Sequence, residues 1–259
     1  MSHVTYALSA GGVGIVTMAR APANSYESEF AHALNESIEA AEADVQCKVV
    51  IVRSAVKGFF CGGADIKQFK ANSPLENQEM IAFAQEALNK PGRSEKIYIA
   101  EVSGHALGGG LEVALACDFR WGAKGTYRIG LPEVTLGLLP GNGGTQRLPA
   151  IVGVNKALEM MVTGVAVQPE EAHRLGLLSR LVDAEELESQ TLQFAQSLAA
   201  GATLAIGKIK RSVYDGYRIA AEAGFAVERV NIGKLFQSAD AYEGFAAFIE
   251  KRKAAFVGR

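Results

Sequence analysis

Short apolar runs alternate with amphipathic segments along the first half of the chain. Residues 4–10 and 12–20 have the composition of strands, and Gly11-Gly12 between them predicts a hairpin. Residues 27–44 place apolar side chains at helical spacing and acidic side chains on the other face, which predicts a helix. Its apolar positions are Phe30, Ala33, Leu34, Ile38 and Ala41.

Two β-branched runs predict strands that are buried on both faces, KVVIVRS at 48–54 and IYIAEVSG at 97–104. A loop and then a helix are expected over 69–92, and a helix over LEVALACDFRWGA at 111–123. This alternation of strands and helices predicts an α/β core with parallel strands.

From about residue 150 the pattern becomes purely helical. Six helical segments are expected, at 155–164, 169–179, 185–201, 204–216, 225–236 and 242–256. The sequence contains no internal repeat and no Pro- or Ser-rich linker. We therefore expect a core at 1–196 and a helical region at 197–259, without a flexible hinge.

The composition narrows the function classes. The 259 residues are 49% apolar and 21% charged, with a net charge of −2, so no general attraction to nucleic acid or anionic membrane is expected. No apolar run reaches the roughly 18 residues of a membrane span, and the first residues do not resemble a secretory signal. Cys47, Cys61 and Cys117 form no CxxC pair and predict buried reduced thiols in a cytoplasmic protein.

Two common motifs fail on their spacing. In GATLAIGKI at 201–209, five residues instead of four separate the glycines, and Ile209 occupies the Ser/Thr position of a phosphate loop. The four histidines have no ligand spacing with each other or with a cysteine, so no metal site is expected.

GHALGGGLE, at 104–112, places three glycines between a predicted strand and a predicted helix. Glycines there let a ligand approach the backbone N–H groups of a helix N-terminus, where the free donors favour negative charge. Close packing of a strand against a helix is the alternative explanation. The FFCGGADIKQF stretch at 59–69 has the same design, and two such strand ends could each donate one N–H to a single oxygen, as an oxyanion hole requires.

Glu112 and Glu133 are carboxylates in apolar segments. Glu133 follows Pro132 and precedes GLLPGNGGTQRL, and its alternative role is a helix cap. Two carboxylates in apolar surroundings are typical of proton transfer, because burial raises at least one pKa toward neutrality.

These motifs, in order and spacing, resemble the crotonase superfamily, and most closely its enoyl-CoA hydratases. The resemblance covers nearly the whole chain and rests on FCGGADI, GHALGGGLE, LPEVTLGLLPGNGGTQRL and AFIEKRKAAF. It implies a spiral of ββα turns, which would hold the active site within 1–196, followed by a C-terminal helical trimerisation region. It further implies a homotrimer or a dimer of trimers.

The resemblance also implies roles for single residues. Ala64 and Gly109 would supply the two oxyanion N–H groups, and Glu112 and Glu133 would be the catalytic glutamates of a hydro-lyase. Glu112 is assigned to water and Glu133 to the C2 proton, an order that the sequence alone does not fix. The positions expected to bind CoA are Ala23, Ala64, Asp65, Ile66, Lys67, Gly109, Phe248 and Lys251. Phe248 and Lys251 would reach the CoA of a neighbouring subunit. The acyl-CoA thioester is the substrate, and no metal or redox cofactor is expected.

Two other functions compete with hydration of a 2-enoyl-CoA. A 3,2-enoyl-CoA isomerase needs only one carboxylate, so the retained pair favours hydration. A non-catalytic RNA-binding homologue would need a lysine-rich helix early in the chain, whereas 27–44 is acidic. PANSYES at 22–28 departs from the family's usual run before the first helix, and this puts the adenine-side wall in doubt.

Overall fold

The computed structural model describes residues 3–255, and side chains throughout that range except at 216–224 and 227–228. A six-stranded sheet in the order β1-β2-β3-β5-β7-β9 forms its centre. β1 and β2 are antiparallel and all other neighbours are parallel. These strands are β1 (Val4–Ser9), β2 (Val13–Met18), β3 (Val49–Ser54), β5 (Ile97–Val102), β7 (Phe119–Ala123) and β9 (Arg180–Val182).

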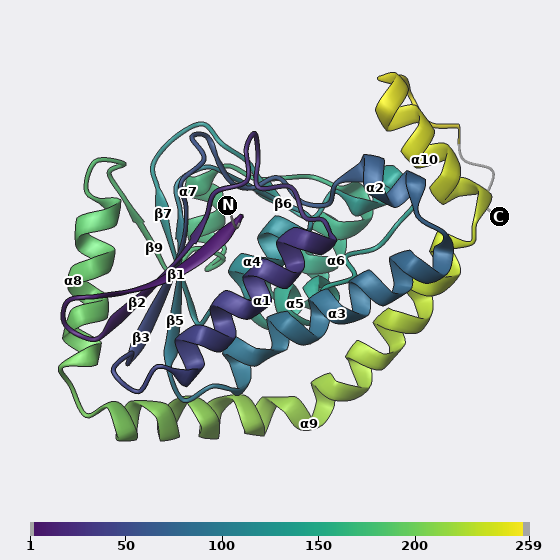
Figure 1. Ribbon diagram of the computed structural model, residues 1–259. Coiled ribbons are helices and arrows are strands. Elements are labelled where there is room, and N and C mark those ends of the chain that lie inside the picture. Colours follow the sequence, from purple (N-terminus) through teal and green to yellow (C-terminus); the bar gives the residue numbers. More distant parts are fainter. Residues whose placement is uncertain (1–2, 256–259) are drawn as a thin grey trace.

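Helices cover this sheet on two sides. Figure 1 shows α8 (Leu187–Ala199) on one side of the strands and α1 (Ser28–Ala43) with α3 (Pro74–Arg93) on the other. The long helix α9 (Thr203–Phe236) then runs beneath α3, and α10 (Ala239–Glu250) lies beside the short helix α2 (Ile66–Ala71). The remaining helices are α4 (Gly109–Ala116), η1 (Glu133–Leu136, a 3₁₀ turn), α5 (Gly144–Val152), α6 (Val154–Thr163) and α7 (Pro169–Arg174).

A second, smaller sheet lies at the end of the first. It consists of three parallel strands in the order β4-β6-β8, namely β4 (Phe59–Cys61), β6 (His105–Leu107) and β8 (Ile129–Gly130). Parallel strands end at the same edge of a sheet, so the segments that follow β4, β6 and β8 are brought together there.

The structure confirms most of the predicted elements and corrects three. The hairpin at Gly11-Gly12, the helix over 28–43 and the strands buried on both faces at 49–54 and 97–102 are all present. The predicted helix over 111–123 is wrong in its second half, because 119–123 is a strand paired with β5 and β9 on its two sides. Tertiary pairing, which the spacing of apolar residues does not register, determines this element.

The region after residue 150 is not purely helical, since β9 adds a strand to the sheet edge. The two helices predicted at 204–216 and 225–236 are one helix, α9. A glycine costs about 1 kcal/mol in a helix interior, which is too little to end a long helix that packs against its neighbours. The division at 196/197 falls inside α8 and stays a prediction. Among the described residues, no helix combines the length and apolarity needed to cross a membrane.

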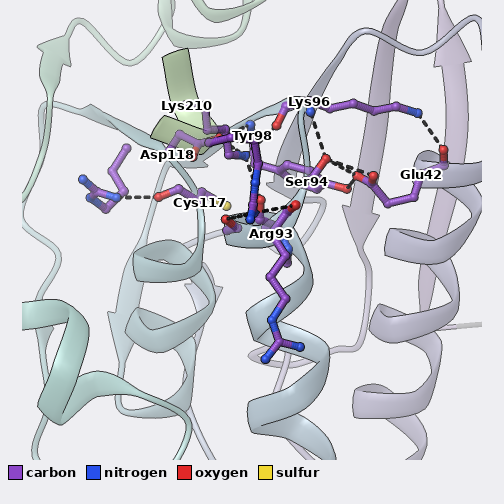
Figure 2. Close-up of polar contacts among 12 residues, drawn as sticks. Glu42, Arg93, Ser94, Lys96, Tyr98, Cys117, Asp118 and Lys210 are labelled. Carbon is purple, nitrogen blue, oxygen red and sulfur yellow. Dashed lines mark hydrogen bonds and ion pairs between the residues drawn. The ribbon is translucent and has the colours of Figure 1, made fainter. Parts of the chain in front are cut away.

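A buried ion pair joins α9 to the sheet. Figure 2 shows Lys210 of α9 reaching Asp118, which lies between α4 and β7. The Lys210 ammonium donates to Asp118 Oδ2 at 2.8 Å and to two backbone carbonyls, and Tyr98 N donates to the same carboxylate oxygen at 2.7 Å. Burial raises the pKa of Asp118 and lowers the pKa of Lys210, because desolvation penalises each charge more than the partner compensates.

Removal of one partner from this pair should be costly, since it leaves the other buried without compensation. We expect Lys210→Met to lower the free energy of unfolding by about 3–5 kcal/mol in urea titrations. Lys208→Met is the matched control two residues away, because Lys208 forms an exposed pair with Glu95. Its loss should stay within about 1 kcal/mol. Equal losses in the two variants would contradict the anchoring role.

Candidate active site

The predicted oxyanion donors follow the ends of two neighbouring strands. Ala64 lies three residues after β4 and Gly109 lies two residues after β6. The backbones meet closely here: a Cβ on Gly63 would lie 2.6 Å from the carbonyl oxygen of Leu107. A Cβ on Gly110 would lie 2.0 Å from the carbonyl oxygen of Cys61, which only glycine permits. The structure therefore brings the two predicted segments together.

The N–H of Ala64 is turned away from its neighbouring strand segment. Tyr26 forms a parallel bridge with Ala64, in which Tyr26 N donates to Gly63 O at 2.7 Å and Asp65 N donates to Tyr26 O at 2.8 Å. In this arrangement the residue between the two bonded peptide groups directs its own N–H and C=O away from the bridge. The Ala64 N–H therefore does not bond to the Tyr26 segment, as an oxyanion donor requires.

The N–H of Gly109 belongs to the first turn of α4. The first N–H groups of a helix have no partner within the helix, and the helix dipole favours negative charge at this end. The preceding residue, Gly108, has a φ of 54°, which lets the chain turn sharply from β6 into α4. The three glycines thus have distinct roles, because Gly108 makes the turn, Gly109 begins the helix and Gly110 packs on Cys61.

Glu112 is buried and fixed by the loop that precedes α5. Its side chain is 1% exposed, and its Oε1 accepts hydrogen bonds from Asn142 N and from Gly144 N, both at 2.7 Å. Two backbone donors on one carboxylate oxygen fix the rotamer of the side chain and stabilise its ionised form. The carboxylate is thereby held beside the N-terminal turn of α4.

Glu133 begins the 3₁₀ turn η1, three residues after β8. Its Oε1 lies next to Gly108, where a Cβ would approach it to 2.9 Å. Gly108 O in turn accepts the hydrogen bond of Glu112 N at 3.1 Å. The Glu133 carboxylate therefore lies at the start of α4, the helix whose first turn carries Glu112. The structure thus brings together the chain segments that carry Ala64, Gly109, Glu112 and Glu133.

Most of the predicted CoA-binding positions lie near these segments. Ala23 O accepts from Gly62 N at 2.8 Å, so Ala23 borders the segment of Ala64. Asp65 caps α2 by accepting from Lys67 N at 3.1 Å, and the Lys67 side chain is exposed. Ile66 is 8% exposed and belongs to an apolar cluster with Phe69, Phe236 and Phe245.

The predicted tail residues Phe248 and Lys251 lie at the end of α10, and Phe248 is 60% exposed. Lys251 ends the helix in a left-handed conformation. Phe245, one turn earlier, is buried, whereas Phe248 is not. α10 itself packs on η1, since a Cβ on Gly244 would lie 2.3 Å from Leu136 O. The tail of this chain therefore borders the turn that carries Glu133.

The site contains two residues that the sequence analysis did not single out. Asn142 and Gly144 hold Glu112 through their backbone N–H groups, and the signal for them was the glycine-rich run GNGG. Cys61 is close to the site but is no nucleophile, because burial raises the pKa of its thiol to about 12.

One group among the described residues has the geometry of a cation site. Ligand atoms of His3, Glu27 and Glu29 lie within 4.8 Å of one another. Glu27 Oε1, however, already pairs with Arg20 Nε at 2.5 Å, so a cation of the chain itself occupies this carboxylate.

Comparison with known proteins agrees with this arrangement. The Enoyl-CoA hydratase/isomerase family profile matches residues 9–259, and the chain belongs to this family. It is 35% identical over 251 residues to a probable enoyl-CoA hydratase of Bacillus subtilis, with 95% of each chain covered. It is 34% identical over 244 residues to the short-chain-enoyl-CoA hydratase of Clostridium acetobutylicum, covering 94% of this chain and 93% of the relative. A crystal structure of an enoyl-CoA hydratase from Bacillus anthracis superposes with a TM-score of 0.80 at 29% identity, covering 99% of this chain and 100% of that one.

The contact between Gly108 and Glu133 predicts a selective loss of activity. Gly108→Ala would place a Cβ 2.9 Å from Glu133 Oε1 and displace the carboxylate, so we expect kcat to fall by about tenfold or more. Gly176→Ala is the control, because Gly176 has a φ of 75° and nothing within 4 Å of an added Cβ. Both variants should also lose stability, because an added Cβ disfavours a positive φ. Unchanged turnover in Gly108→Ala would show that the contact between Gly108 and Glu133 does not matter for catalysis.

Proposed function

We propose that this protein adds water across the 2,3 double bond of a 2-enoyl-CoA thioester, with Glu112 and Glu133 as its catalytic residues. The observation that carries the proposal is the approach of the Glu133 carboxylate to Gly108, at the start of the helix whose first turn carries Gly109 and Glu112 and packs on the segment before Ala64. Hydration needs these two functions side by side, namely an oxyanion hole for the thioester and a pair of groups that deliver a water molecule.

The thioester carbonyl accepts hydrogen bonds from Ala64 N and Gly109 N. These bonds strengthen as negative charge develops on the oxygen of the enolate, so they stabilise the transition state more than the ground state. Removal of one such donor typically costs about 3–4 kcal/mol of transition-state stabilisation. The α4 dipole acts in the same direction.

Glu112 and Glu133 divide the proton chemistry. Glu112, whose carboxylate is held by two backbone donors, accepts a proton from the water that attacks C3. Glu133 delivers a proton to C2 from the neighbouring turn. This order is supported by the two backbone N–H groups that hold the Glu112 carboxylate.

We extend the proposal to CoA binding and assembly. Ala23, Asp65, Ile66 and Lys67 would border the CoA, and Phe248 and Lys251 would contact CoA from a neighbouring subunit. Self-association as a homotrimer or a dimer of trimers agrees with an exposed apolar stripe along and just beyond α6. The stripe consists of Val154, Leu158, Val162 and Val165, each more than half exposed. The need for no metal or redox cofactor and the cytoplasmic location stay predictions.

Amide substitution tests the two carboxylates. Glu112→Gln and Glu133→Gln should each lower kcat by about 10²-fold or more, because a positioned acid or base contributes about 10²–10⁴. Turnover is measured with a 2-enoyl-CoA, and the fold is checked by circular dichroism. Near-normal turnover in a folded variant removes that residue from the mechanism.

Isotope incorporation separates hydration from isomerisation. A 2-enoyl-CoA incubated with the protein in ¹⁸O-water should yield a product labelled at the C3 hydroxyl, with one solvent proton at C2. An isomerase moves a proton between C2 and C4 and adds no oxygen. Rapid conversion of a 3-enoyl-CoA without any labelled hydroxyl from the 2-enoyl substrate would favour the isomerase.

A further inference from the structure

The loop that holds Glu112 is itself held from behind by two helices. Gly141 sits between α3 and α9, because a Cβ on it would lie 3.0 Å from Ile81 of α3 and 3.5 Å from Ile232 of α9. Its peptide group joins the Gly141 carbonyl to the N–H of Asn142, and this N–H donates to Glu112 Oε1 at 2.7 Å. A group that hydrogen-bonds to the Gly141 carbonyl therefore also affects the Asn142 N–H that binds the Glu112 carboxylate.

Gln85 of α3 binds that carbonyl. Its Nε2 donates to Gly141 O at 3.3 Å, and the Gln85 side chain is 0% exposed. The other end of the same amide, Oε1, accepts a hydrogen bond from Arg229 Nη1 of α9. Because a guanidinium can only donate, this bond fixes which end of the Gln85 amide faces Gly141.

A continuous path of hydrogen bonds thus runs from a cation to the proposed base. It leads from the Arg229 guanidinium through the Gln85 amide and one peptide group to Glu112. Each donor in such a chain polarises the next, so a positive charge at one end strengthens the last hydrogen bond to the carboxylate. The adjoining peptide is supported separately, since Arg147 Nη1 donates to Asn142 O at 2.7 Å.

We propose that Gln85 and Arg229 are positioning residues that fix the Glu112 carboxylate through the Gly141–Asn142 peptide, so that the C-terminal helix α9 controls the geometry of water attack. The inference rests on the proposed role of Glu112. Neither residue touches the substrate. Their effect therefore falls on the chemical step and not on acyl-CoA binding, because a misplacement of about 1 Å at a catalytic group can cost about 10²-fold in rate.

Arg229→Met and Gln85→Met test the path. Each keeps an unbranched side chain but breaks the chain of hydrogen bonds, so kcat should fall by about tenfold to hundredfold while KM changes less than about twofold. Arg229→Lys keeps the donor and the charge and should recover part of kcat. A rise in KM with kcat unchanged, or no recovery by lysine, would overturn the proposal.

Arg211→Met is the matched control on the same pair of helices. Arg211 of α9 also donates to α3, at the carbonyls of Gly92 and Arg93, but this contact leads to no residue of the site. It should lower stability as much as Arg229→Met does and leave kcat unchanged. An equal fall of kcat in both variants would show that Arg229 acts only as a general contact between helices, which would overturn the proposal.

A double-mutant cycle with Glu112→Gln completes the test. If Arg229 acts through Glu112, Arg229→Met should lower the residual kcat of Glu112→Gln by less than about twofold, since coupled residues are not additive. Additive losses would overturn the inference. The proposed function fails in a distinguishable way, because then Glu112→Gln alone would retain its turnover.

Discussion

The close approach of the backbones after β4 and β6 is the constraint on which the site depends. Gly110 packs directly on the carbonyl of Cys61, at a distance where a methyl group would overlap it. This contact places the first turn of α4 against the segment of Ala64, so N–H groups from distant parts of the sequence come together. The proposed oxyanion hole would therefore be a consequence of packing between glycine-lined strand ends, and the helix dipole would add to it.

The second requirement is a buried carboxylate whose oxygens find hydrogen-bond donors. A buried charge is expensive unless hydrogen bonds compensate it. Glu112 is compensated by backbone donors of the loop before α5, which is built from residues with little side-chain bulk. Glu133 approaches the start of α4 from η1. Glu112 follows β6 in the chain and Glu133 follows β8, and these two segments meet because β6 and β8 are adjacent and parallel.

The sequence predicted the parts of this site whose signals are local. Glycines after apolar runs marked the segments 59–69 and 104–112, within which the family resemblance implied Ala64 and Gly109, and carboxylates in apolar segments marked Glu112 and Glu133. Asn142 was not predicted, because it acts through a backbone N–H that any residue could supply. β7 was predicted as helix for a related reason, since its partners β5 and β9 lie 20 or more residues away in the chain. Where tertiary pairing determines whether a segment is a strand, the local sequence does not predict it.

Tertiary contacts also explain how α9 contributes to the site. Lys210 near its start is buried in an ion pair with the sheet, whereas Arg229 near its end reaches α3 at the level of the site. The first contact fixes the helix to the core, and the second extends from that fixed helix toward Glu112. A helix anchored at one end can transmit position along its length because its backbone hydrogen bonds keep it rigid. Helix α9 therefore contributes to the geometry of the proton chemistry through its contacts with α3 and the sheet.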